Sequence, residues 1–131
     1  MNTQTTTRNT VTPRHDDTVT QNLICSYKVD GTAVFDRDGE KLGTVRNLMI
    51  DRSSGQVANV IVGFGGLFGM GEDHYPMPWD ALNYDPDKKG YVTKFDREML
   101  SKDKAPHFAR DRQPEWNAEY SRSIRSYYLP R

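Results

Sequence analysis

The 131-residue chain has little cysteine and no excess of charge of either sign. Cys25 is its single cysteine, so no internal disulfide and no cysteine-based metal cage can hold the fold together. Eighteen lysine and arginine residues balance eighteen aspartate and glutamate residues. A chain with this balance lacks the excess of positive charge that nucleic-acid-binding proteins use to contact phosphate groups. We therefore expect a fold held by packing, and no nucleic-acid partner.

Long apolar runs are also missing. Uninterrupted apolar stretches such as Val60–Val62 are only three residues long, far short of the roughly 20 residues that span a bilayer. Residues 1–17 contain no apolar stretch typical of a secretory signal. We expect a cytoplasmic protein without a transmembrane segment, and a peripheral contact with a membrane stays open.

The apolar residues, 35% of the chain, are concentrated between residues 32 and 84. Residues 1–22 contain eight threonines and few apolar side chains, so they cannot bury enough surface to offset the entropy lost on ordering. We expect a disordered tail there, with an edge strand as the alternative because threonine favours strands. The predicted organisation is a tail over 1–22, a folded domain over 23–104, and a linker with an amphipathic helix over 105–131.

Within the folded domain, short apolar runs alternate with turn residues, a pattern typical of antiparallel strands. In a regular strand, apolar residues at every second position lie on one face. The apolar residues of the strand expected over 41–51 change face twice, which predicts bulges near Gly43 and Asn47. The strand over 57–64 is apolar on both faces, so one face needs a cover. The C-terminal segment or a second copy of the chain could provide it. The expected strands cover 32–35, 41–51, 56–64, 72–78 and a hairpin over 83–93.

An aromatic stripe marks the C-terminal segment. From Pro114 onward, apolar residues recur every three or four positions and predict an amphipathic helix of about four turns that ends before Pro130. Two interpretations stay open: the helix packs on its own domain, which is the commoner outcome, or it docks into a groove of a partner. The stripe consists of Trp116, Tyr120, Ile124, Tyr127 and Tyr128.

Four segments, in this order and spacing, resemble the PRC-barrel family. They are residues 34–45 with an Asp-Arg-Asp-Gly turn, the strand 57–63, the glycine-rich loop 65–71 and the sequence Pro-Trp-Asp-Ala-Leu at 78–82. The resemblance implies an all-β fold: a small, highly curved antiparallel barrel, here with a C-terminal amphipathic helix. The family includes a domain of the photosynthetic reaction-centre H subunit and a domain of a ribosome-maturation factor. Its known members bind other proteins and are not catalysts, and this chain looks like a stand-alone bacterial or archaeal member.

The glycine-rich loop has two interpretations. Its backbone N–H groups could form a nest for an anion, but its spacing fits neither phosphate-binding motif and no helix follows it. A structural crossover is therefore the favoured interpretation, and binding of an anion or small molecule is the alternative. Leu67, Phe68 and Met70 at its tip would suit contact with a protein if they are exposed.

Few residues suggest chemistry. Alternate residues of a strand share a face, so only Glu72 and His74 of the acidic cluster around Asp73 can meet. We expect His74 to be solvated or hydrogen-bonded rather than a metal ligand. Cys25 lies among apolar neighbours and is expected at the edge of the core, without a base beside it. No catalytic, metal or cofactor site is predicted.

These observations predict a non-enzymatic protein-binding or scaffolding module that associates with itself, with a dimer as the expected order, and that also binds an unidentified protein. The alternatives are an anion or small-molecule binder that uses residues 65–71, and an RNA-associated or ribosome-associated factor. The candidate contact residues are Leu67, Phe68, Met70, Trp116, Tyr120, Ile124, Tyr127 and Tyr128.

Overall fold

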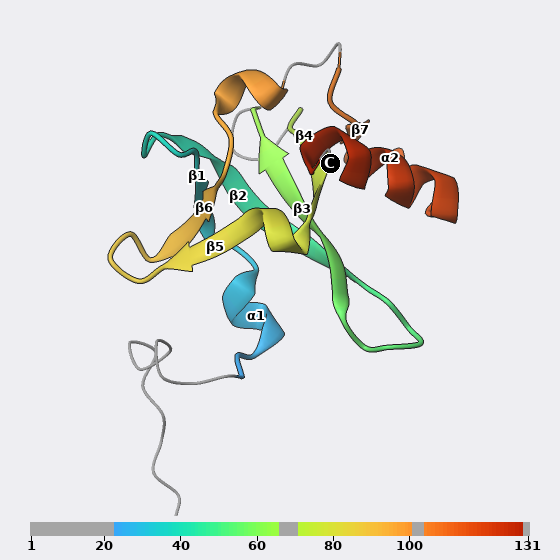
Figure 1. Cartoon of the computed structure of the whole chain (residues 1–131), viewed down its shortest axis with the longest axis horizontal. Helices are drawn as coiled ribbons and strands as arrows, with labels where there is room; N and C mark the ends of the chain where they lie inside the picture. Colours follow the sequence, from blue (N-terminus) through green and yellow to red (C-terminus); the bar gives the residue numbers. More distant parts are fainter. Residues whose placement is uncertain (1–22, 66–70, 101–103, 130–131) are drawn as a thin grey trace, which may run out of the picture.

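One curved sheet of seven strands forms the body of the molecule (Figure 1). The computed structural model describes residues 23–65, 71–100 and 104–129. The strands are β1 (Ala33–Phe35), β2 (Lys41–Ile50), β3 (Val57–Phe64), β4 (Asp73–Pro78), β5 (Leu82–Asp85), β6 (Gly90–Thr93) and β7 (Phe108–Ala109). The helical segments are α1 (Ser26–Val29), the 3₁₀ turns η2 (Trp79–Ala81) and η3 (Arg97–Leu100), and α2 (Ala118–Tyr128). None of the helices in the described ranges has the length and apolar character that crossing a bilayer requires.

The sheet is mixed, which corrects the expectation of a purely antiparallel one. Its order is β5-β6-β1-β2-β3-β4-β7, and β6 runs parallel to β1 with Ala33 paired to Gly90. Parallel neighbours need a long crossover, which β2 to β5 supply here. Gly90 permits the approach, because a Cβ atom there would lie 2.7 Å from the carbonyl oxygen of Ala33. Among the described residues the edge strands β5 and β7 are not paired with each other, so the sheet curls without closing.

Strand β2 bends at the two places that the sequence predicts. Its pairing with β3 jumps between Val45 and Asn47, which leaves Arg46 as the extra residue of a bulge. Its pairing with β1 jumps from Gly43 to Lys41. A bulge bends a strand and turns the side chain of the extra residue toward a new direction. The first bulge therefore sets the direction of Arg46.

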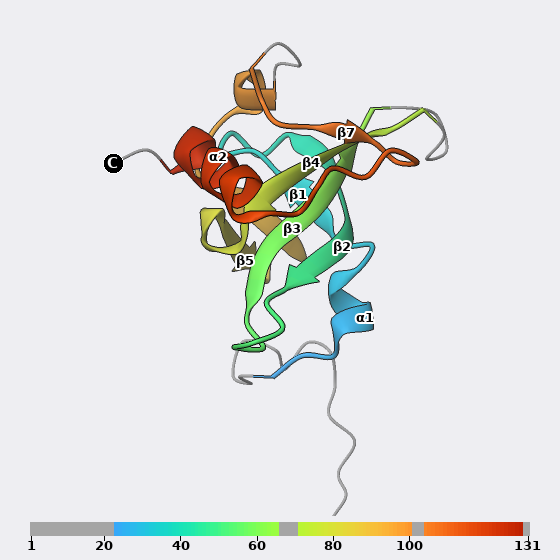
Figure 2. The ribbon, with the colours of Figure 1, turned by 90° about the vertical axis from the view of Figure 1, so that its right-hand side faces the viewer.

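The concave side of the sheet and helix α2 share one hydrophobic core. Val34, Val45, Val60 and Val62 are fully buried there, and Ile124 of α2 is equally inaccessible. Helix α2 lies beside β4 in both views of the ribbon (Figures 1 and 2). The open side of the curled sheet is therefore filled by side chains of the helix.

Helix α2 begins later than its aromatic spacing predicts. Its first residue is Ala118, because the side chain of Asn117 accepts a hydrogen bond from the backbone N–H of Tyr120 at 2.8 Å and caps the helix. Trp116 therefore lies before the helix, where its ring meets the edge of Phe108 at a centroid distance of 5.8 Å.

The segment between β7 and α2 covers the outer side of β4. It crosses in front of β3 and β4 in Figure 2, and β7 pairs directly with β4. Phe108 contacts the ring of His74, which lies on the same face of the sheet as Ile61. Of the two covers considered for the second apolar face of β3, the structure uses the C-terminal segment, and Ile61 is buried.

Candidate functional site

Two residues of the predicted aromatic stripe belong to the core. Ile124 has no exposed surface, and Tyr128 is 5% exposed with its ring 5.0 Å from that of Phe95. Burial raises the pKa of the Tyr128 hydroxyl, and the neighbouring hydroxyls of Tyr127, Tyr75 and Tyr120 raise it further. The hydroxyl therefore stays neutral, and in this conformation neither Ile124 nor Tyr128 faces a partner.

The other residues of the stripe also turn toward their own domain. The Tyr127 hydroxyl donates to the carbonyl oxygen of Met99 at 2.6 Å, and the rings of Trp116 and Tyr120 meet edge to face. Arg125, on the exposed side of α2, forms an ion pair with Asp80 of η2 at 2.9 Å. The structure thus brings the stripe together as a packing surface, the first of the two interpretations of the helix.

The tip of the glycine-rich loop carries three of the predicted contact residues. Leu67, Phe68 and Met70 lie outside the described residues, so their prediction as contact residues stays a prediction.

An ion pair with a buried carboxylate joins β2 to Glu72, the residue before β4. Arg46 donates from Nε and Nη2 to the two carboxylate oxygens of Glu72, each at 3.0 Å. His74 Nε2 lies 3.3 Å from the same carboxylate. The Glu72 side chain is only 6% exposed, whereas that of Arg46 is 39% exposed. Burial works to raise the pKa of Glu72, but Arg46, helped by His74, outweighs burial and holds the pKa below its ordinary value.

Gly63 of β3 lies beneath this carboxylate. A Cβ atom at Gly63 would collide with the Glu72 carboxylate, so the ion pair can cross β3 only because glycine stands there. Glu72 and His74 do share a face, as their spacing predicts, and His74 is buried and hydrogen-bonded rather than solvated. In the described ranges no three His, Cys, Asp or Glu side chains gather as metal ligands would. The arrangement is therefore a brace between strands.

The Gly63→Ala variant tests this brace. Because the new methyl group displaces the Glu72 carboxylate, we expect the free energy of unfolding to fall by about 2 kcal/mol, the usual cost of overpacking. Urea denaturation followed by circular dichroism measures it. Ala58→Ser, at an exposed position of the same strand, should change stability by less than about 0.5 kcal/mol. Equal stabilities of the two variants would contradict the role of Gly63.

Sequence reasoning missed the most exposed apolar surface of the described chain. Leu23, Ile24 and Tyr27 are 86%, 49% and 68% exposed, and Tyr84 of β5 is 43% exposed. We call these four residues the α1 face. Helix α1 has four residues and buries only Val29, so it carries no periodicity that a sequence pattern could reveal. Cys25 is exposed as well, which corrects its expected place at the edge of the core.

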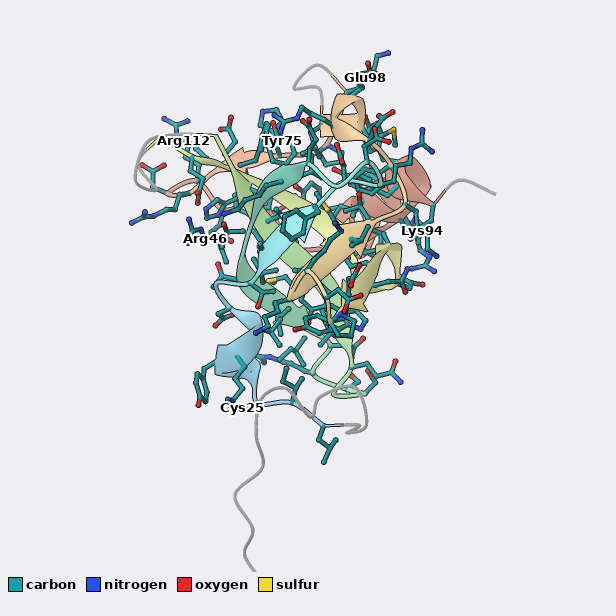
Figure 3. All side chains as sticks on the ribbon, turned by 90° about the vertical axis from the view of Figure 1, so that its left-hand side faces the viewer. Cys25, Arg46, Tyr75, Lys94, Glu98 and Arg112 are labelled. Atoms are coloured by element: carbon teal, nitrogen blue, oxygen red, sulfur yellow. The ribbon has the colours of Figure 1, made fainter. Side chains whose placement is uncertain are left out.

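A groove opens on the α1 face, between α1 and the β5–β6 hairpin. Its volume is about 370 Å³. Three tyrosine rings dominate its lining, and Lys28 and Lys89 supply the charges. Figure 3 shows Cys25 at this end of the molecule, with Arg46 farther up the sheet. The lining residues are Ile24, Tyr27, Lys28, Thr32, Tyr84, Lys89 and Tyr91.

A family model described as the PRC-barrel domain matches residues 24–100. No curated protein matches the chain. The matched range runs from α1 to η3, so it includes the groove and the ion pair but not β7 and α2.

Proposed function

Because this chain belongs to the PRC-barrel family, we propose that it is a non-enzymatic protein-binding module that associates with itself. The observation that carries the proposal is the gathering of exposed apolar side chains on the α1 face. Single exposed apolar side chains are common on protein surfaces, but Ile24, Tyr27 and Tyr84 together line one groove, and such a group is typical of an interface.

We also infer that α2 acts as part of the barrel rather than as the contact surface. Ile124 and Tyr128 pack in the same cluster as residues of β1 to β6, and the ion pair of Arg125 with Asp80 ties the outer side of the helix to η2. On this view α2 completes the curled sheet into a barrel. We then expect the α1 face to make the contacts with other molecules. Leu67, Phe68 and Met70 remain predicted contact residues.

Light scattering after size exclusion tests self-association. Over a wide range of chain concentrations, we expect the mass to rise from 15.0 kDa toward twice that value. The variant Leu23→Ser/Ile24→Ser should stay monomeric to higher concentration, because it removes two exposed apolar side chains of the α1 face. Arg122→Ser, on the exposed side of α2, is the matched control and should associate like the wild type. A monomeric mass at every concentration would contradict self-association.

A further inference from the structure

We propose that two copies pair across a two-fold axis at the α1 face, with Tyr27 of each copy inserted into the groove of the other. This inference rests on the proposed self-association and names its surface. An isologous pair needs one patch that is complementary to itself, because each copy presents the same residues to its partner. The α1 face meets this requirement, since Tyr27 borders the groove and most of its surface remains exposed there.

The groove suits an aromatic ring. Its 370 Å³ lies at the small end of ligand pockets, which hold roughly 300–1,000 Å³. The rings of Tyr84 and Tyr91 meet edge to face at 5.4 Å, and the 43% exposed Tyr84 can also contact the ring of a partner. Tyr27 is the ring best placed to enter from a second copy, because 68% of its surface is exposed at the mouth of the groove.

The charges beside the groove favour a second copy over a strongly charged partner. Lys28 lines the groove from α1, and Asp30 directly follows that helix. The β5–β6 hairpin carries Asp85, Asp87, Lys88 and Lys89. Three lysines and three aspartates therefore balance on these two elements, so a second copy related by a two-fold axis meets no excess of charge of either sign.

Lys89 contributes to the groove from an unusual backbone conformation. Its φ of 54° makes it the only non-glycine residue with a positive φ among those that the structure describes. Glycine or asparagine would adopt this conformation at lower cost. The aliphatic part of a lysine side chain can cover an apolar ring while its charge stays in water, which suits the rim of an interface.

Cys25 provides the probe, since it is the single cysteine of the chain, is exposed and directly precedes α1. A short bismaleimide should link two full-length wild-type chains through Cys25. Tyr27→Asp should abolish the link and raise the dimer dissociation constant at least about 30-fold, as removal of a central aromatic contact does. Ile50→Asp is the matched control: Ile50 is 55% exposed and does not line the groove, so the link and the dissociation constant should stay unchanged. Both variants should keep the melting temperature of the wild type, because both side chains are exposed.

The outcomes separate this inference from the proposed function. A dimer that Cys25 does not link and that Tyr27→Asp leaves intact would overturn the two-fold arrangement while self-association stands. Equal weakening by Tyr27→Asp and Ile50→Asp would overturn the assignment to the groove. A chain that is monomeric throughout would overturn both proposals.

Discussion

Replacing Ile124 with alanine should lower the free energy of unfolding by about 3 kcal/mol, within the range found when a buried aliphatic side chain is cut to alanine. Ile124 has no exposed surface and packs in the core cluster with residues of the sheet. The substitution therefore removes buried apolar surface and leaves a cavity that the rigid strands around it cannot fill. Urea denaturation followed by circular dichroism gives the change.

Arg122→Ala is the matched control for Ile124→Ala. Arg122 lies on the exposed side of the same helix, and arginine and alanine both favour helices, so its effect should stay within about 0.5 kcal/mol. A loss below about 1 kcal/mol for Ile124→Ala would mean that α2 is not part of the core. In that case the helix would again be a candidate for docking onto a partner, the second interpretation of its aromatic stripe.

Local signals in the sequence predicted most strands because turn chemistry is local. The glycines in the turns after β1 and β2, Gly39 and Gly55, have φ values of 91° and 77°, which favour glycine. The bulges of β2 could be predicted from the changes of face of its apolar residues, because that pattern lies within one strand. The family and the C-terminal helix could likewise be recognised from contiguous segments.

Features that depend on residues far apart in the chain could not be predicted from the sequence. The parallel pairing of β1 with β6 joins residues more than fifty positions apart, and no periodicity records such a partner. The equal spacing of the aromatic stripe could not locate the start of α2, because the cap at Asn117 overrides it. Helix α1 is too short to show a pattern, so the α1 face was found only in the structure.

Only part of the ion-pair site of Arg46, Glu72 and His74 could be predicted from the sequence. The spacing of Glu72 and His74 placed them on one face, as observed. Arg46 could not be assigned to them, because its direction depends on a bulge and its reach depends on the missing side chain of Gly63. Three strands must be in register before these residues meet.

The Glu72→Gln substitution should lower the free energy of unfolding by about 2 kcal/mol at neutral pH. Hydrogen bonds to charged groups contribute about 1.5–3 kcal/mol, and breaking a fully buried pair costs more. We expect a value below that upper range because water reaches the 39% exposed side chain of Arg46 and weakens the interaction. Glu98→Gln, at an exposed position of η3, is the control and should change stability little. A double-mutant cycle with Arg46→Gln should show a coupling energy of at least about 0.5 kcal/mol.

The cost of Glu72→Gln should depend on pH in a direction set by the lowered pKa of Glu72. In the unfolded chain this carboxyl takes up a proton near its ordinary pKa of 4.5, whereas the folded chain holds it ionised to lower pH. The folded state then binds fewer protons, so the ion pair stabilises fully above about pH 5 and loses its effect as pH falls through the folded pKa. Asp51 and Asp80 also have lowered pKa values, but both chains retain them and their contributions cancel in the difference. Urea midpoints of wild type and variant, measured from about pH 7 down to about pH 3, should therefore converge. A difference that stays constant or grows in acid would show that the Glu72 side chain stabilises the fold by its shape and not by its charge.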